Sequence, residues 1–142
     1  MTFEEVAHVT RSLAGKISAD LPKLDGLVGV SRGGWVPTRM LSSLLSVKRI
    51  YSIGLQYSDP ARTQLVCYDD PAPFLSAPAV LLVIEDCLET GNALRYAKDH
   101  LVSKGHTVHT AALFLTKKSA FVPDFYIERL EVPPSFPWEL QK

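Results

Sequence analysis

The sequence predicts a single α/β domain built around a doubly wound, mostly parallel β-sheet. The alternation of segments and the length of the chain support this prediction. Short apolar runs alternate along the chain with segments whose apolar residues recur at helical spacing. Such alternation is typical of right-handed β–α–β crossovers, which place helices on both faces of a sheet. The length of 142 residues corresponds to one domain, 1–142, and no repeat or low-complexity tract divides it.

The N-terminal segment predicts a helix followed by a buried strand. Thr2 and Glu5 have the spacing of a capping box, and apolar residues then recur at helical spacing to about Ala19. Pro22 ends this helix, because proline cannot continue one. The apolar run 26–30 that follows is typical of a buried strand, and it leads into a loop with two consecutive glycines.

The next part of the chain is regular at first and then loosely patterned. Residues 35–45 predict a second helix, and residues 47–57 predict a second strand. Turn-forming residues punctuate the stretch 58–76, around a brief strand-like segment at 64–68. A loosely patterned stretch of this length predicts a flexible functional loop.

The second half of the chain continues the alternation. The run 80–84 is the most strongly apolar segment, as expected of a strand buried on both faces of a sheet, and two carboxylates and a short turn follow it. A helix is predicted from about residue 90 to 104, with Gly105 at its end, and a further strand over 107–115. Residues 122–142 are rich in proline and aromatic residues, which predicts an extended hood.

Charge and cysteine content argue against several classes of protein. Fifteen Lys and Arg residues balance fifteen Asp and Glu residues, so the chain lacks the basic surface of a protein that binds nucleic acid or a membrane. Its apolar runs are much shorter than a membrane span, and the acidic N-terminus does not have the pattern of an export signal. Cys67 and Cys87 lack metal-ligand spacing, and we expect them to be free thiols in the cytoplasm.

Two predicted strand ends carry sequences suited to ligand binding. In open parallel sheets, ligands bind beyond the carboxyl ends of the strands. The first such end is Ser31-Arg32-Gly33-Gly34, in which the glycines allow close backbone approach and Arg32 offers the forked cation that suits phosphate. An ordinary tight turn is the alternative explanation of the two glycines.

The second strand end follows the run 80–84. Glu85 and Asp86 place two carboxylates there, which can accept hydrogen bonds from sugar hydroxyls or hold a hydrated magnesium ion. Thr90 and Gly91 then open a helix, whose N-terminus suits a phosphate monoester. Phosphate at one end, with a diol and a metal at the other, predicts a ribose 5-phosphate ligand. The alternative is a solvated acidic turn.

Together these segments resemble the type I phosphoribosyltransferase family, in particular the small xanthine-guanine and hypoxanthine enzymes. The family's signature for phosphoribosyl pyrophosphate is a hydrophobic strand, two acidic residues, a short turn and Thr-Gly, which residues 80–94 match. The family's pyrophosphate loop is a Ser-Arg-Gly-Gly run, which residues 31–34 reproduce. The segment 136–139, Phe-Pro-Trp-Glu, is similar to the carboxyl-terminal signature of microbial members.

The resemblance implies a glycosyltransferase that moves phosphoribose from phosphoribosyl pyrophosphate to a nitrogenous base, for which we expect a 6-oxopurine. It implies Glu89 and Arg32 as catalytic residues, Glu85 and Asp86 as ligands of a Mg²⁺ cofactor, and a homo-oligomer. The residues implied in binding the base are Lys117, Pro133 and Pro134. Those implied in binding phosphoribosyl pyrophosphate are Ser31, Arg32, Gly33, Gly34, Glu85, Asp86, Cys87, Leu88, Glu89, Thr90, Gly91, Asn92 and Ala93.

Four positions depart from the family's pattern. Glu89 stands where many relatives have aspartate, and Ala93 lacks the hydroxyl that often adds a phosphate contact. Near the tail, Pro133 falls at the relatives' base-stacking aromatic residue, and Pro134 has no backbone N–H for the base edge. These departures motivate an alternative, a catalytically weak or inactive regulatory protein that binds a nucleotide or phosphoribosyl pyrophosphate. A third interpretation is another doubly wound nucleotide-binding enzyme.

Overall fold

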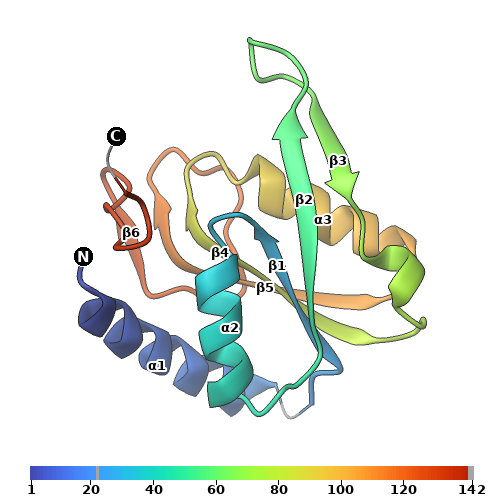
Figure 1. Ribbon diagram of the computed structural model, residues 1–142, viewed down its shortest axis with the longest axis horizontal. Helices are drawn as coiled ribbons and strands as arrows, with labels where there is room; N and C mark the ends of the chain where they lie inside the picture. The colour runs from blue at the N-terminus through green and yellow to red at the C-terminus, as the bar shows by residue number, and fades with distance from the viewer. Residues whose placement is uncertain (22, 141–142) are drawn as a thin grey trace.

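The computed structural model describes residues 1–21 and 23–140 and contains a six-stranded sheet (Figure 1). The strand order is β3-β2-β1-β4-β5-β6, and each neighbouring pair is parallel except β2 with β3. This architecture confirms the predicted fold class. Pro22, the predicted helix end, lies outside the described residues. The elements are α1 (Phe3–Asp20), β1 (Gly26–Ser31), α2 (Trp35–Leu44), β2 (Ile50–Tyr57), β3 (Leu65–Asp69), the 3-10 helix η1 (Ala72–Phe74), β4 (Val80–Leu88), α3 (Asn92–Ser103), β5 (Thr107–Thr116) and β6 (Glu128–Leu130).

Helices cover both faces of the sheet. On one face, Leu13 of α1 and Leu41 of α2 share a buried cluster with Leu82 of β4. On the other face, Leu94 of α3 shares a second cluster with Val83 of β4. Successive β4 residues therefore serve opposite clusters, which explains why this strand is apolar without alternation. None of the helices that the structure describes is long and apolar enough to cross a membrane.

β4 is longer than the sequence predicts. The predicted strand ends at Ile84 and passes into a turn, whereas β4 continues to Leu88. In this extension Cys87 is in register with Phe114 of β5, and Leu88 with Leu115. The predicted turn is therefore wrong, because pairing with the ten-residue β5 keeps the acidic segment extended. The periodicity of β4 alone cannot reveal that pairing.

The tail also differs from the predicted extended hood, because part of it joins the sheet. Residues Glu128–Leu130 form β6, which pairs in parallel with the end of β5. Beyond β6, the buried ring of Phe136 stacks with those of Phe114 and Trp138, at centroid distances of 6.2 and 4.6 Å. The tail is thus an edge strand followed by an aromatic plug, on the face of the sheet that α1 covers.

The loosely patterned stretch 58–76 contains regular structure. The strand-like segment predicted at 64–68 is β3, which pairs with β2 as an antiparallel hairpin. The tip of this hairpin projects beyond the rest of the sheet (Figure 1). The predicted flexibility of the stretch stays a prediction.

The turn from β1 into α2 packs directly on the backbone of the sheet. A Cβ atom added at Gly34 would lie 2.4 Å from the carbonyl oxygen of Ile84 and 2.7 Å from that of Val30. Both are backbone atoms, which no change of rotamer can move away. Glycine therefore allows α2 to begin this close to β1 and β4.

We expect Gly34→Ala to lower the free energy of unfolding by about 1–3 kcal/mol, because the added methyl group overpacks a backbone contact. Gly15→Ala is the matched control, since a Cβ at this exposed position of α1 meets nothing within 4 Å. Alanine favours the helix there, so this variant should gain about 0.5–1 kcal/mol. Urea unfolding followed by circular dichroism measures both, and equal effects of the two substitutions would contradict the close-approach explanation.

Candidate active site

The two loops singled out from the sequence lie at the same edge of the sheet. β1 and β4 are parallel neighbours, with Gly29 in register with Ile84, so their carboxyl ends lie side by side. Residues 31–34 follow one strand, and residues 85–93 complete the other and lead into α3. The sheet therefore brings together the glycine loop, the two carboxylates and the start of a helix.

The loops are in direct contact. A Cβ atom at Gly33 would lie 2.5 Å from a carboxylate oxygen of Asp86, so the glycine loop rests against that side chain. Ser31 is held from the other side, because its hydroxyl shares a 2.8 Å hydrogen bond with the hydroxyl of Tyr68 in β3. The peptide bond between Ser31 and Arg32 is cis. The Arg32 side chain itself is exposed at the mouth of this loop.

The loop before α3 is held in place by the end of β5 and by the chain that follows it. The Thr116 hydroxyl donates to the carbonyl oxygen of Glu89 at 2.8 Å, and the Ala120 N–H donates to that of Thr90 at 3.1 Å. Gly91 caps the helix with φ of 84°, a left-handed conformation that favours glycine. The first N–H groups of a helix lack partners within the helix, which makes a helix start suited to an anion. Here the N–H of Asn92 donates to the hydroxyl oxygen of Thr90 at 3.3 Å.

A cavity of about 280 Å³ lies at this place. Its lining comes from the end of β4, the start of α3 and the β2–β3 hairpin, and it contains the carboxylates of Glu85 and Glu89 and the helix start. The residues that line it are Tyr57, Arg62, Glu85, Cys87, Leu88, Glu89, Thr90, Gly91, Asn92 and Ala93. The structure thus gathers most of the sequence-predicted sugar-phosphate residues around one hollow.

Burial makes the carboxyl groups at the end of β4 costly to ionise. Burial, with smaller contributions from Asp86 and Glu89, raises the pKa of Glu85 to about 8. Burial also raises the pKa of Asp86 to about 6, although the N–H of Cys87 donates to this carboxylate at 2.6 Å. Burial beside these carboxylates raises the pKa of the Cys87 thiol to about 12, which makes it a poor nucleophile.

Glu85 and Asp86 suit a magnesium ion that is bound partly through its substrate. Within the described residues no group of three or more His, Cys, Asp or Glu side chains could hold a metal ion. Magnesium sites often use one or two carboxylates and complete their coordination with water and substrate phosphates. The pair of oxygen donors fits that arrangement.

The expected residues 31–34 and Asp86 are not part of the lining of this cavity. The three residues expected to bind the base also lie apart from it. Lys117 follows β5 and forms an exposed ion pair with Glu131. Pro133 and Pro134 lie further along the tail, beyond β6. Their role toward a base stays a prediction.

Sequence reasoning missed the residues that the hairpin and β5 contribute. Tyr57 and Arg62 line the cavity, Tyr68 contacts the glycine loop, and Thr116 holds the loop before α3. The only signal for Arg62 and Tyr68 was the loosely patterned stretch that contains them, and Tyr57 ends the predicted strand just before it. Nothing in the local sequence marks Thr116.

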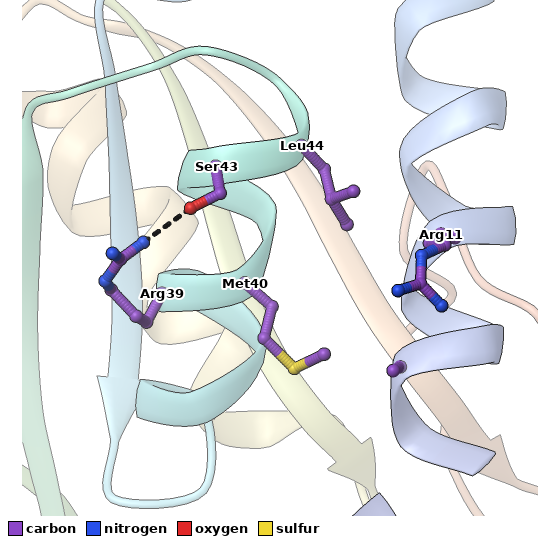
Figure 2. Close-up of a pocket in the computed structure, with 6 residues that line it drawn as sticks. Arg11, Arg39, Met40, Ser43 and Leu44 are labelled. Atoms are coloured by element: carbon purple, nitrogen blue, oxygen red, sulfur yellow. Dashed lines mark hydrogen bonds between the residues drawn. The ribbon is translucent and has the colours of Figure 1, made fainter. Parts of the chain in front are cut away.

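A second hollow, of about 410 Å³, lies between α1 and α2 (Figure 2). Figure 2 shows Met40 and Leu44 of α2 facing this groove, and Arg39 donating a hydrogen bond to the hydroxyl of Ser43. The described residues that line it include no carboxylate and no helix N-terminus. It therefore lacks the groups that make the cavity at the end of β4 chemically distinctive.

Comparison with known proteins identifies the family of this chain. The family model for the phosphoribosyl transferase domain matches residues 3–141, nearly the whole chain. The chain belongs to the phosphoribosyltransferase family. Phosphoribosyltransferases are glycosyltransferases of the pentosyl-transferring kind, so the expected enzyme class is confirmed.

Individual relatives agree with this assignment. The chain is 26% identical to a xanthine-guanine phosphoribosyltransferase of Idiomarina loihiensis over 148 residues, which cover 99% of this chain and 86% of the relative. The structure of a purine phosphoribosyltransferase from Pyrococcus horikoshii superimposes with a TM-score of 0.84 at 24% identity, covering 100% and 94% of the two chains. A Neisseria gonorrhoeae protein with bound ppGpp superimposes with a TM-score of 0.87 at 22% identity, covering 99% and 88%. Both solved structures share the fold described above.

The raised pKa of Glu85 predicts a stability cost in the ligand-free phosphoribosyltransferase. The unfolded chain releases this proton near pH 4.5, whereas the folded chain holds it to about pH 8. The stabilisation from the protonated carboxyl is therefore lost as the pH rises from about 4.5 to 8. We expect Glu85→Gln, which cannot ionise, to gain stability relative to the parent across this window.

Thermal unfolding at several pH values measures this difference. Glu128→Gln is the matched control, because Glu128 is exposed in β6, away from the cavity. A stability difference between Glu85→Gln and the parent that does not grow with pH would contradict the account.

Proposed function

We propose that this phosphoribosyltransferase transfers phosphoribose from phosphoribosyl pyrophosphate to a 6-oxopurine and releases pyrophosphate. The observation that carries the proposal is the contact between the two loops, Gly33 resting on Asp86, beside the cavity at the start of α3. This contact supports a single ligand held both by a loop suited to pyrophosphate and by a loop suited to a sugar phosphate. The relative from Idiomarina loihiensis is named for xanthine and guanine, which supports a 6-oxopurine acceptor.

The glycine loop and the start of α3 hold opposite ends of the ligand. The N–H groups around Thr90–Ala93 bind the 5-phosphate, where the helix dipole favours negative charge. Arg32 binds the pyrophosphate, to which its guanidinium can donate two hydrogen bonds. Bond breaking at the anomeric carbon produces an oxocarbenium-like state, so positioning and charge stabilisation supply most of the rate enhancement.

The carboxylates act on the sugar and on the base. Glu85 and Asp86 accept hydrogen bonds from the ribose hydroxyls and hold Mg²⁺, which supplies neutralising charge to the pyrophosphate when bound. Glu89 lines the cavity with an exposed side chain and serves as the general base for the purine N–H. Lys117 contacts the exocyclic oxygen of the base, for which its pair with Glu131 must open.

Two broader properties belong to the same proposal. Exposed apolar side chains at Trp35, Leu44 and Ile50 support a homo-oligomer, which light scattering after gel filtration tests. Cys67 and Cys87 are both free, as expected of a protein that works in the reducing cytoplasm.

A regulatory nucleotide-binding protein is the second candidate function. It is favoured by the structural similarity to a Neisseria gonorrhoeae protein whose structure holds ppGpp. Lys117 also forms an ion pair with Glu131, whereas a lysine that binds the base would have to leave that pair. Calorimetry, which measures nucleotide binding, and a pyrophosphate assay together distinguish the candidates. Tight nucleotide binding without pyrophosphate release favours regulation.

We expect the protein with Mg²⁺ to release pyrophosphate from phosphoribosyl pyrophosphate when guanine, xanthine or hypoxanthine is added. A coupled pyrophosphate assay over a panel of bases that includes adenine, uracil and orotate measures this directly. Release with none of these bases would contradict the proposed function, and release with orotate or uracil alone would contradict the purine assignment.

Glu89→Gln tests the assignment of the general base. General bases typically contribute about 10²–10⁴ in rate, so kcat should fall by that order, whereas Glu89→Asp should retain most of the activity. Glu131→Gln is a useful comparison, because it frees Lys117 without touching the cavity. An unchanged kcat in Glu89→Gln would remove Glu89 from this role.

A further inference from the structure

The tip of the β2–β3 hairpin forms one wall of the sugar-phosphate cavity. Tyr57, at the end of β2, and Arg62, in the turn, line this cavity together with the start of α3. Among the described residues that line it, Arg62 carries the one cationic side chain. The lining also includes Glu85 and Glu89, so both acidic and basic side chains surround the cavity.

The tip has a defined conformation, and the Asp59 carboxylate organises it. This carboxylate accepts hydrogen bonds from the N–H of Thr63 at 2.9 Å and of Gln64 at 3.0 Å, and from the Thr63 hydroxyl. Hydrogen bonding from Thr63 and Gln64 holds the pKa of Asp59 below its usual value. Within this ring of hydrogen bonds Arg62 adopts a left-handed backbone conformation, with φ of 57°.

Contacts at the cavity connect Arg62 to the first residue of α3. The Arg62 guanidinium carbon lies 4.8 Å from the centroid of the Tyr57 ring, a cation–π arrangement. The Tyr57 hydroxyl in turn accepts a 3.3 Å hydrogen bond from the side-chain amide of Asn92. The guanidinium is thus stacked on a ring that is itself tied to the helix start.

This arrangement addresses an electrostatic difficulty of the cavity. A ribose phosphate carries nearly two negative charges at neutral pH, and Glu85 and Glu89 line the same hollow. Ala93 cannot supply a hydroxyl donor at the start of α3. A guanidinium offers both a compensating charge and a fork of N–H donors that matches phosphate geometry.

We infer that Arg62 binds the 5-phosphate of the sugar phosphate, as a cationic partner to the N–H groups of residues 90–93. The inference rests on the proposed function, since it assigns a residue to one end of the same ligand. It distinguishes Arg62 from Arg32, which serves the pyrophosphate end. Asp59 and Tyr57 position Arg62, and Arg62 supplies the positive charge to the phosphate.

Isothermal titration with phosphoribosyl pyrophosphate, and separately with pyrophosphate, each with Mg²⁺, tests the inference. Arg62→Ala should weaken binding of phosphoribosyl pyrophosphate about tenfold to a hundredfold and leave binding of pyrophosphate unchanged. Arg62→Lys should fall between this variant and the parent, because it keeps the charge and loses the fork. Arg11→Ala is the matched control, as this arginine of α1 lines the groove between the helices.

Three results would overturn the inference. They are unchanged binding of phosphoribosyl pyrophosphate by Arg62→Ala, equal weakening of both ligands, and equal weakening in Arg11→Ala. Arg62 is exposed, and circular dichroism of Arg62→Ala should match that of the parent. If the parent itself does not bind phosphoribosyl pyrophosphate, the proposed function fails, an outcome distinct from failure of Arg62 alone.

Discussion

Two glycines at the end of β1 set the distance between the loops on which the site depends. Gly34 packs on the backbone of Val30 and Ile84, and Gly33 packs on the carboxylate of Asp86. A side chain at Gly34 would push α2 away from the backbone of β1 and β4, and one at Gly33 would displace the carboxylate of Asp86. Because the contact is close, a loop carrying Arg32 and a strand end carrying two carboxylates can face one small ligand.

Burial then gives this edge of the sheet its electrostatic character. The chain as a whole is neutral, with fifteen basic and fifteen acidic residues. Locally, β4 carries Glu85 and Asp86 further along the sheet than its apolar run, into surroundings that raise their pKa values. Carboxylates that are costly to ionise in the free protein gain most from a cation and from sugar hydroxyls. The same feature that lowers the stability of the free protein therefore favours ligand binding.

The sequence predicted those parts of the fold and site that depend on local pattern. The capping box at Thr2, the alternation of strands and helices, and the order of the two loops are local, and the structure confirms them. The extension of β4 and the strand β6 depend on pairing with β5, which is encoded in a distant segment. The conformation of the hairpin tip likewise depends on one carboxylate, Asp59, whose turn-forming context predicts a loop but not its hydrogen bonds. Arg62 was missed for that reason.

The central claim is that one ligand spans the glycine loop and the start of α3. Amide hydrogen exchange with and without phosphoribosyl pyrophosphate and Mg²⁺ tests it most directly, because bound phosphate protects the N–H groups that contact it. The account predicts slower exchange in peptides covering residues 31–34 and 89–94, with little change along α1. Protection confined to the groove between α1 and α2, around residues 7–11 and 39–44, would contradict it.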